Sequence, residues 1–494
     1  MAKHYKNFID GKEVDAKSGK TFENRNPATW DQVLSTFPLS GKEDVDESVK
    51  AARKAFEKWR LVPPPARGDI LRKVGDLLTA RKEELATTMT REMGKVLLET
   101  RGDVQEGIDT AYYAAAEGRR LFGHTVPSEL SSKFNMAIRV PIGVAGIITP
   151  WNFPMAIPTW KMFPALVCGN TVIFKPASDT PETAAKLVEI LVGAGIPDGV
   201  VNIVHGGGSQ VGTAIVEHPD IDLISFTGST GVGRKISEVA AKTLKRVSLE
   251  LGGKNAQIVM DDARLDLALD GVLWGAFGTT GQRCTATSRL VVHEKVYDRF
   301  LSMLLDRTKK LQLGDGLKEG TDVGPLVNQG QVETVDKYVK IGTEEGAKVL
   351  TGGKRAAGDG LAKGWFYEPT ILGEVTPSMR VATEEIFGPV LSVIRVKNIA
   401  EAIEVANSTK YGLSSSVYTQ DINNAYQAIR DIKAGITYIN APTIGAEAHM
   451  PFGGVKETGN GHREGGWTVY EFYSEWKTVY VDYSGKLQRA QIDT

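Results

Sequence analysis

The first candidate for a reactive side chain is a cysteine in a segment rich in glycine and polar residues. Cys284 lies in the stretch 281–286, which reads GQRCTA. Gly278 and Gly281 permit backbone conformations that other residues resist, and Arg283 directly precedes the cysteine. Because the thiolate is the nucleophilic form, a neighbouring positive charge would favour reactivity. The alternative is a buried and inert thiol, which we expect of Cys168.

A nucleophilic cysteine needs a base, and the sequence offers a carboxylate for this role. None of the seven histidines stands in a motif that marks it as the partner of a cysteine. Glu250 closes an apolar run and is followed by Leu-Gly-Gly. Burial at a strand end would raise the pKa of this carboxyl and suit it to general-base catalysis. A strand-end carboxylate that pairs with Lys254 is the alternative.

Two further segments could hold a reacting oxygen and a cofactor phosphate. Asn152 lies between prolines in PWNFP, where its amide could donate to an oxyanion or simply form a turn. The segment 226–233, FTGSTGVG, follows an apolar run and opens a helix, a place that favours phosphate. Its glycine order, G-x-x-G-x-G, differs from the usual dinucleotide-binding turn. Lys175 could reach a ribose or a phosphate, or be a solvated turn lysine. No cluster has metal-ligand spacing, so no metal site is predicted.

These candidates lie at the ends of apolar runs that alternate with helical patterns, after a helical region that spans 43–59 and 66–120. Such alternation predicts an α/β fold with parallel sheets that bind ligands at the carboxyl ends of their strands. The pattern restarts after residues 250–254, which indicates a second α/β unit. The expected elements are strands at 144–148, 171–174, 201–204, 223–226, 256–260 and 289–293, and helices at 182–192, 234–244, 265–277 and 295–311.

Two alternating strands, 133–141 and 475–483, have no obvious partner in either unit. A strand that is left unpaired exposes backbone donors and acceptors, so we expect these two to pair with each other, across subunits.

The bulk properties set the class of protein. With 494 residues, the chain is too long for one hydrophobic core to be expected. A net charge of −1 gives no reason to expect a nucleic-acid or anionic-membrane surface. There is no run of about 18 apolar residues and therefore no predicted membrane span. Two cysteines cannot build a disulfide framework, and no secretory segment is recognised, so a cytoplasmic enzyme is predicted.

Together these segments resemble the aldehyde dehydrogenase superfamily over essentially the whole chain, and the spacing from Glu250 to Cys284 also matches. The segments stand in the family's order: PWNFP (150–154), FKPAS (174–178), FTGST-GVG (226–233), LELGGK (249–254), GQRCTA (281–286), EEIFGPV (384–390) and PFGG (451–454). The resemblance implies a Rossmann-type dinucleotide-binding domain (1–120 and 142–253), an α/β catalytic domain (254–470) and a small β oligomerisation arm (121–141 and 471–494). A homodimer or homotetramer follows from that arm.

The resemblance also implies the reaction, an NAD(P)-dependent oxidation of an aldehyde to a carboxylic acid. Cys284 would form a thiohemiacetal whose oxyanion accepts from the Asn152 side chain and the Cys284 N–H. Hydride transfer to nicotinamide would leave a thioester, and Glu250 would activate the hydrolytic water. Lys161 and Glu464 match positions thought to relay protons or order the site.

The remaining implied contacts are with the cofactor and the aldehyde. Lys175 would bind the adenosine ribose, Ser229 the pyrophosphate and Glu385 the nicotinamide ribose, while Phe387 would pack beside the ring. The cofactor-binding residues are Ile148, Thr149, Pro150, Trp151, Lys175, Ser178, Gly208, Gly212, Phe226, Thr227, Gly228, Ser229, Glu250, Leu251, Gly252, Glu385 and Phe387. The substrate-binding residues are Phe153, Ile157, Trp160, Arg283, Thr285 and Phe452.

Two departures from the family pattern matter. Many NAD-preferring members have Glu where this chain has Ser178, so repulsion of a 2′-phosphate is removed and NADP should be accepted. An extra His462 precedes Arg463 and Glu464, which puts the match at Glu464 in doubt.

Three other functions and several substrates stay open. An acyltransferase that uses coenzyme A or phosphate need not keep Glu250, a cysteine hydrolase would need a histidine, and a silent scaffold would not need the whole Cys, Glu and Asn set. Specificity should lie in the tunnel and the loop 441–450. Arg283 could meet the carboxylate of a semialdehyde acid, whereas Glu447 and His449 could favour a cationic substrate or simply be solvated.

Overall fold

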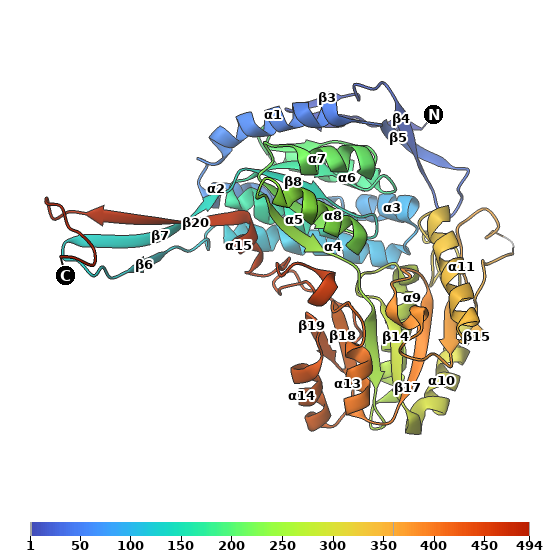
Figure 1. Cartoon of the computed structure of the whole chain (residues 1–494). Helices are drawn as coiled ribbons and strands as arrows, with labels where there is room; N and C mark the ends of the chain where they lie inside the picture. Colours follow the sequence, from blue (N-terminus) through green and yellow to red (C-terminus); the bar gives the residue numbers. More distant parts are fainter. Residues whose placement is uncertain (1, 359, 494) are drawn as a thin grey trace.

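Two seven-stranded sheets, each covered by helices, make up most of the molecule, and a thin β arm projects from one of them (Figure 1). The structure is a computed structural model that describes residues 2–358 and 360–493. A small N-terminal sheet has the order β1-β5-β4. Its strands are β1 (Lys3–His4), β4 (Thr21–Arg25) and β5 (Val33–Pro38).

The first large sheet has the order β12-β11-β8-β9-β10-β2-β3 and is parallel from β12 to β10. Every residue of β8 and β9 is buried, as expected for strands that helices cover on both faces. The strands are β2 (Asn7–Ile9), β3 (Lys12–Val14), β8 (Val144–Ile148), β9 (Thr171–Lys175), β10 (Val201–Ile203), β11 (Leu223–Thr227) and β12 (Arg246–Glu250). The predicted strands of this unit are confirmed.

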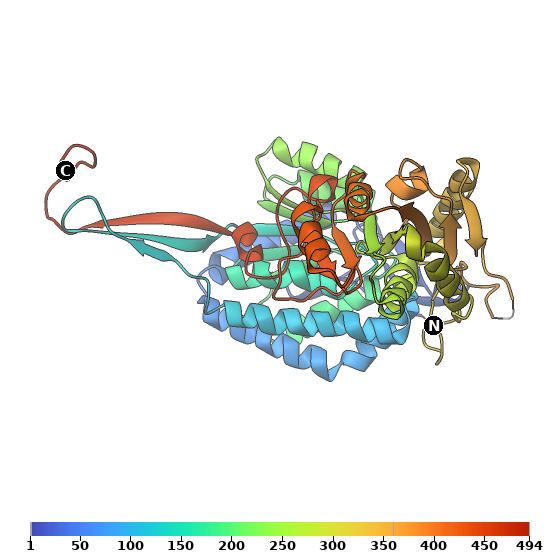
Figure 2. The same cartoon turned by 90° about the horizontal axis from the view of Figure 1, so that it is seen from below.

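Helices cover this sheet, and Figure 2 shows α2 and α4 as a long layer beneath it. The helices are α1 (Lys42–Trp59), α2 (Pro64–Ala80), α3 (Lys82–Met93), α4 (Leu97–Glu117), α5 (Ala156–Cys168), α6 (Pro181–Gly193), η1 (Gly208–Gly212), α7 (Thr213–Glu217) and α8 (Thr230–Ala241). The long helical region thus comprises four separate helices: α1 and α2 are separated by a segment that ends at Pro63, α2 and α3 meet at Arg81, and α3 ends at the left-handed Gly94.

The second sheet has the order β15-β16-β17-β14-β13-β18-β19. Its strands are β13 (Asn255–Val259), β14 (Thr287–His293), β15 (Lys348–Thr351), β16 (Thr370–Gly373), β17 (Val390–Val396), β18 (Ser414–Tyr418) and β19 (Ile436–Ile439). Its helical segments are α9 (Leu265–Phe277), η2 (Gly278–Gly281), α10 (Glu294–Thr308), α11 (Gln329–Glu344), α12 (Arg380–Thr383), α13 (Ile399–Asn407), α14 (Ile422–Asp431) and η3 (Lys456–Thr458). The four residues 251–254 connect the end of β12 in the first sheet to the start of β13 in the second.

The arm consists of β6 (His124–Val126), β7 (Lys133–Pro141) and β20 (Ser474–Asp482). Strand β20 pairs antiparallel with β7 of the same chain, from Ser474 opposite Pro141 to Asp482 opposite Lys133. The prediction that these strands pair across subunits is therefore wrong. The reason is that α15 (Val469–Tyr473) brings the chain back to the base of the arm, where Glu471 accepts hydrogen bonds from Arg139.

Among the described residues, no helix combines the length and the apolar character that crossing a bilayer requires.

Candidate active site

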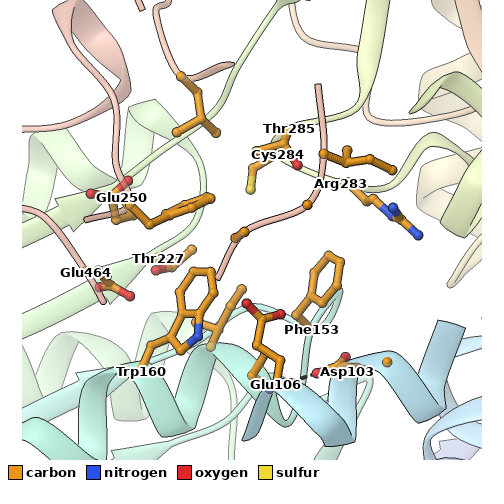
Figure 3. Close-up of a pocket in the computed structure, with 18 of the residues that line it drawn as sticks. Asp103, Glu106, Phe153, Trp160, Thr227, Glu250, Arg283, Cys284, Thr285 and Glu464 are labelled. Atoms are coloured by element: carbon orange, nitrogen blue, oxygen red, sulfur yellow. Dashed lines mark hydrogen bonds between the residues drawn. The ribbon is translucent and has the colours of Figure 1, made fainter. Parts of the chain in front are cut away.

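A cavity of about 330 Å³ opens where the two sheets meet, and Figure 3 shows the side chains around it. Cys284 enters it from the second sheet, and Glu250 enters from the first. Apolar side chains line much of the rest, and the rings of Trp160 and Phe452 pack with their centroids 4.8 Å apart. The sequence-predicted residues that line the cavity are Phe153, Ile157, Trp160, Thr227, Glu250, Leu251, Arg283, Cys284, Thr285, Phe452 and Glu464.

The loop that carries Cys284 follows three residues in a left-handed backbone conformation and is fixed by hydrogen bonds from Asn255. Thr279, Thr280 and Gly281 in η2 all have left-handed φ values, of 52°, 57° and 69°. Such conformations cost free energy in non-glycine residues and persist only where surrounding contacts impose them. Asn255 supplies one such contact, since its Nδ2 donates to the carbonyls of Cys284 at 2.8 Å and Ala286 at 2.9 Å. The sulfur is thereby fixed toward the cavity.

Arg283 does not act on the sulfur as predicted. Burial raises the pKa of the Cys284 thiol to about 12, with further contributions from the carboxylates of Glu250 and Glu385. Arg283 donates instead to Glu99 at 2.9 Å and to Thr279 at 2.8 Å, and Figure 3 shows its guanidinium turned away from the sulfur. The prediction that Arg283 favours the thiolate is wrong, because its charge is neutralised by a carboxylate that lies far away in the sequence.

The raised pKa of Cys284 has a measurable consequence for the free protein. Because the thiolate fraction grows with pH below the pKa, the rate of alkylation by iodoacetamide should rise from about pH 6 to about pH 9 without a plateau. Mass spectrometry of the peptide that contains Cys284 measures this rate, and Cys284→Ala reports the background from the buried Cys168. A plateau near pH 7 would contradict the burial argument.

Glu250 is a buried carboxylate without a partner. It ends β12, and neither of its carboxylate oxygens has a hydrogen-bond partner among the described residues. The alternative that it pairs with Lys254 is wrong, since the Nζ of Lys254 is also without a partner. Burial, followed by the charge of Glu464, raises the pKa of Glu250 well above its usual value. Such a carboxyl can accept a proton near neutral pH, as a general base must.

A buried ion pair lies beside Glu250. Lys161 of α5 pairs with Glu464, and its Nζ also donates to Ser225 at 3.1 Å. Glu464 lines the cavity although His462 is inserted two positions before it. The backbone N–H and carbonyl of Glu464 both pair with the backbone of Phe452, which also lines the cavity, and this pairing fixes the position of Glu464. The ring of His462 packs 4.9 Å from that of Phe472 and stays outside the cavity lining. The insertion therefore leaves Glu464 at the cavity.

Two N–H groups at or beside the Cys284 loop are available to hold an oxyanion, although Asn152 is not among the residues that line the cavity. Asn152 uses one amide hydrogen to donate to the carbonyl of Gln282, at 3.1 Å, which leaves its second N–H available. The backbone N–H of Cys284 donates to no other backbone group in the described part of the chain. Both groups are attached to rigid segments, so an oxyanion could be bound with little rearrangement.

The predicted cofactor residues gather at one edge of the first sheet. Strands β12, β11, β8 and β9 are parallel neighbours, so Leu251, Gly228, Thr149 and Lys175 lie at the same end of the sheet. Ile148, Pro150, Trp151, Phe226, Thr227 and Gly252 flank these strand ends, Gly208 and Gly212 bound η1 after β10, and Ser229 is the residue before α8. The carboxyl edge of a parallel sheet is where such folds bind nucleotides.

Buried charges at this edge lack full partners. Within the described part of the chain, Lys175 donates only to the adjacent carbonyl of Pro176, at 2.9 Å, and burial lowers its pKa to about 8. Glu385 accepts from the Gly253 N–H at 3.0 Å, and burial raises its pKa to about 7. A ribose offers both donors and acceptors to such groups, so these residues fit a dinucleotide. Phe387 lies edge-on to Trp151, with ring centroids 5.4 Å apart.

The match to known sequences decides the family. Residues 14–479 match the Aldehyde dehydrogenase family. The chain belongs to the aldehyde dehydrogenase family. The predicted family, fold class and enzyme class are therefore confirmed.

Individual aldehyde dehydrogenases are similar over nearly their whole length. An alpha-ketoglutaric semialdehyde dehydrogenase of Bacillus subtilis is 43% identical over 97% of this chain and 98% of its own. A D-glyceraldehyde dehydrogenase (NADP(+)) of Picrophilus torridus is 41% identical over 97% and 96%. The crystal structure of betaine aldehyde dehydrogenase from Staphylococcus aureus, in complex with NAD+, has a TM-score of 0.95 at 34% identity and covers 98% of this chain and 95% of that one.

One wall of the cavity was missed from the sequence of this aldehyde dehydrogenase. Glu99, Asp103 and Glu106 of α4 line the cavity, although they lie far from every motif in the sequence. Their spacing of four and three residues places them on one face of a helix, which the sequence could have revealed. The loop 441–450 was correctly expected to contribute, through Ile444, Gly445 and Ala446.

Proposed function

We propose that Cys284 is the nucleophile and Glu250 the general base in the oxidation of an aldehyde to a carboxylic acid, with NAD or NADP as hydride acceptor. The observation that carries the proposal is the shared cavity, in which a half-buried thiol and a buried, unpartnered carboxylate enter from opposite sheets. Burial raises the pKa of the Cys284 thiol, so the thiol needs a proton acceptor as it attacks, and the raised pKa of Glu250 suits that carboxylate to this role.

Each step of the proposed reaction can be assigned to particular residues of the chain. The thiolate of Cys284 adds to the aldehyde carbon, and the oxyanion accepts from the second N–H of Asn152 and from the Cys284 N–H. Bound NAD or NADP supplies the hydride acceptor. Glu250 then takes a proton from the water that hydrolyses the thioester, and the ion pair of Lys161 and Glu464 leads that proton away. Phe153, Ile157, Trp160, Thr285 and Phe452 surround the aldehyde and limit access of water.

The cofactor lies along the carboxyl edge of the first sheet in this proposal. Lys175 and Glu385 hold the two riboses, and the pyrophosphate lies at the start of α8 beside Ser229. Gly208 and Gly212 contact the adenosine half, and Phe387 packs beside the nicotinamide. Relatives that are named for NADP or bound to NAD+ support both cofactors.

Ser178→Glu should shift the preference of the enzyme toward NAD. Ser178 follows β9, and its Oγ donates to the Gly206 carbonyl at 3.2 Å, which places it beside η1. A carboxylate there would repel a 2′-phosphate and should lower kcat/KM for NADP by about 10²-fold, with NAD little changed. Parallel kinetics with both cofactors measure the effect, and Ser178→Gln serves as the uncharged control. Equal losses for the two cofactors would show that Ser178 is distant from the 2′ position.

The domain boundaries and the assembly are part of the same proposal. Residues 1–120 and 142–253 bind the cofactor, 254–470 carry the nucleophile, and 121–141 with 471–494 form the arm.

Because β20 has a free outer edge with exposed Trp476 and Tyr480, we expect a homodimer or homotetramer. Light scattering should show this assembly and a smaller species for Tyr480→Asp, whereas a wild-type monomer would contradict it. The need for a free Cys284 thiol fits a reducing compartment such as the cytoplasm.

The assay that tests the activity follows absorbance of the reduced nicotinamide with butanal, 3-aminopropanal and succinic semialdehyde, each with NAD and with NADP. Reduction without coenzyme A or phosphate is expected, and the acid should form in equal amount. Activity that depends on either of these acceptors would instead identify an acyl-transferring enzyme.

A further inference from the structure

One wall of the active-site cavity carries a carboxyl that the proposed reaction does not use. Five of the residues that line the cavity are acidic, and they differ in whether a buried cation pairs with them. Three have a buried cation as partner: Glu99 pairs with Arg283 at 2.9 Å, Asp103 with Lys95 at 2.7 Å, and Glu464 with Lys161. The two that remain are Glu250, beside the nucleophile, and Glu106.

Glu106 lies on α4 and points into the cavity. Figure 3 shows its carboxylate between Trp160 and Phe153, on the side of the cavity opposite Cys284. Its Oε1 is fully buried and has no hydrogen-bond partner among the described residues. Burial, followed by the charge of Asp103, raises the pKa of Glu106 to about 8. A buried polar atom without a partner is costly, so this position is suited to a ligand that donates hydrogen bonds.

The other charged side chains of this wall are already paired with one another, so they are not available to bind a charged group of the substrate. Arg283 is held by Glu99, so a substrate carboxylate could reach it only by competing with that pair. Lys95 and Asp103 satisfy each other with both side chains fully buried. The wall therefore presents one unmatched acidic group with the Trp160 ring beside it, while the Phe153 ring already has the Nζ of Lys95 at 3.5 Å from its centroid. A buried, unmatched carboxyl next to an aromatic ring favours a cation.

We propose that Glu106 binds a protonated amine at the end of the substrate opposite the aldehyde, so that the enzyme prefers aminoaldehydes. This inference rests on the proposed function, because it takes the cavity beside Cys284 to be the aldehyde site. The ammonium donates to the carboxylate of Glu106 while the aldehyde carbon lies at the sulfur of Cys284. A cation at this place also stabilises the ionised form of Glu106.

Steady-state kinetics with Glu106→Gln give the first test. The matched substrates are 3-aminopropanal and butanal, which differ in a terminal ammonium or methyl group, and Gln keeps the size of the side chain without its charge. We expect kcat/KM for 3-aminopropanal to fall by about 10- to 100-fold, mainly through KM, and that for butanal to change less than about twofold. Asp109→Asn removes an exposed charge from the same helix, which acts on Glu106 only as a minor influence, and should change kcat/KM for either substrate by less than about twofold. Equal effects of Glu106→Gln on both aldehydes would overturn the inference.

A second test does not depend on turnover. The thiolate of Cys284 displaces methanesulfinate from 2-aminoethyl methanethiosulfonate, which is cationic, and from methyl methanethiosulfonate, which is neutral. The ratio of the two rates should fall about tenfold in Glu106→Gln, and Cys284→Ala corrects for Cys168. An unchanged ratio overturns the role of Glu106 even if aldehydes are oxidised. A lowered ratio without cofactor reduction for any aldehyde would retain the cation site and refute the proposed function.

Discussion

Replacing Cys284 with alanine is expected to lower the rate of NAD(P) reduction by at least ~10⁴-fold, since Cys284 is the one thiol among the described residues that line the cavity. The loss should appear in kcat, because the aldehyde pocket and the cofactor edge of the first sheet keep their side chains. Stopped-flow absorbance of the reduced nicotinamide, with cofactor and aldehyde at saturation, measures the effect.

Cys168→Ala is the matched control for this change. Cys168 is buried at the end of α5, remote from the cavity lining, and burial raises its pKa to about 12. We expect its kcat to stay within about twofold and its stability to fall by about 1 kcal/mol, the usual size for a small buried deletion. Substantial turnover by Cys284→Ala would contradict the covalent mechanism, and loss of activity in Cys168→Ala at unchanged stability would place chemistry at the wrong cysteine.

Glu250→Gln should separate the two halves of the reaction. The variant keeps the shape of the side chain and loses its capacity to accept a proton. Thiol attack should be slower without this proton acceptor but should still lead to hydride transfer, so a burst of reduced cofactor close to one per active site is expected. The steady turnover that follows should be slower than in the wild type by about 10²- to 10⁴-fold. Rapid mixing resolves the burst amplitude from the slow phase.

The trapped acyl-enzyme provides the control for this interpretation. Hydroxylamine attacks a thioester without help from a general base, so it should restore turnover in Glu250→Gln and release a hydroxamate. Glu238→Gln, an exposed change on α8, should behave as the wild type. If Glu250→Gln shows neither burst nor rescue, the carboxylate is already essential for thiol attack, and the expected separation of the two half-reactions is wrong.

Local patterns predicted the central strands of the first sheet and the strands β13 and β14 of the second. Apolar runs such as 144–148 and 223–226 end where the parallel sheet ends, so the strand ends could be placed without coordinates. Cys284, Glu250 and Asn152 could be proposed as site residues because each lies at or next to a strand end in a short motif with few alternatives. The strand ends and the short motifs could therefore be predicted from patterns within about ten neighbouring residues.

The errors came from partners that are distant in sequence. Arg283 was expected to act on Cys284, but Glu99 is more than 180 positions away and neutralises it, a fact that no local pattern contains. Strand β20 was expected to pair across subunits, because the role of α15 in returning the chain to β7 depends on how that helix packs on α5. Glu106 was missed because its importance lies in a missing partner, which only a three-dimensional account of all neighbouring charges reveals.

The connection between the sheets has a further consequence. Glu250 ends β12 of one sheet, Cys284 precedes β14 of the other, and residues 251–254 provide the short link between the strands. The reacting atoms therefore come from two bodies, and their alignment depends on the interface rather than on either core. Mild denaturants that loosen this interface should abolish activity at concentrations where the helices of both bodies still give their full circular dichroism signal. Loss of activity would then report the separation of the two bodies before either of them unfolds.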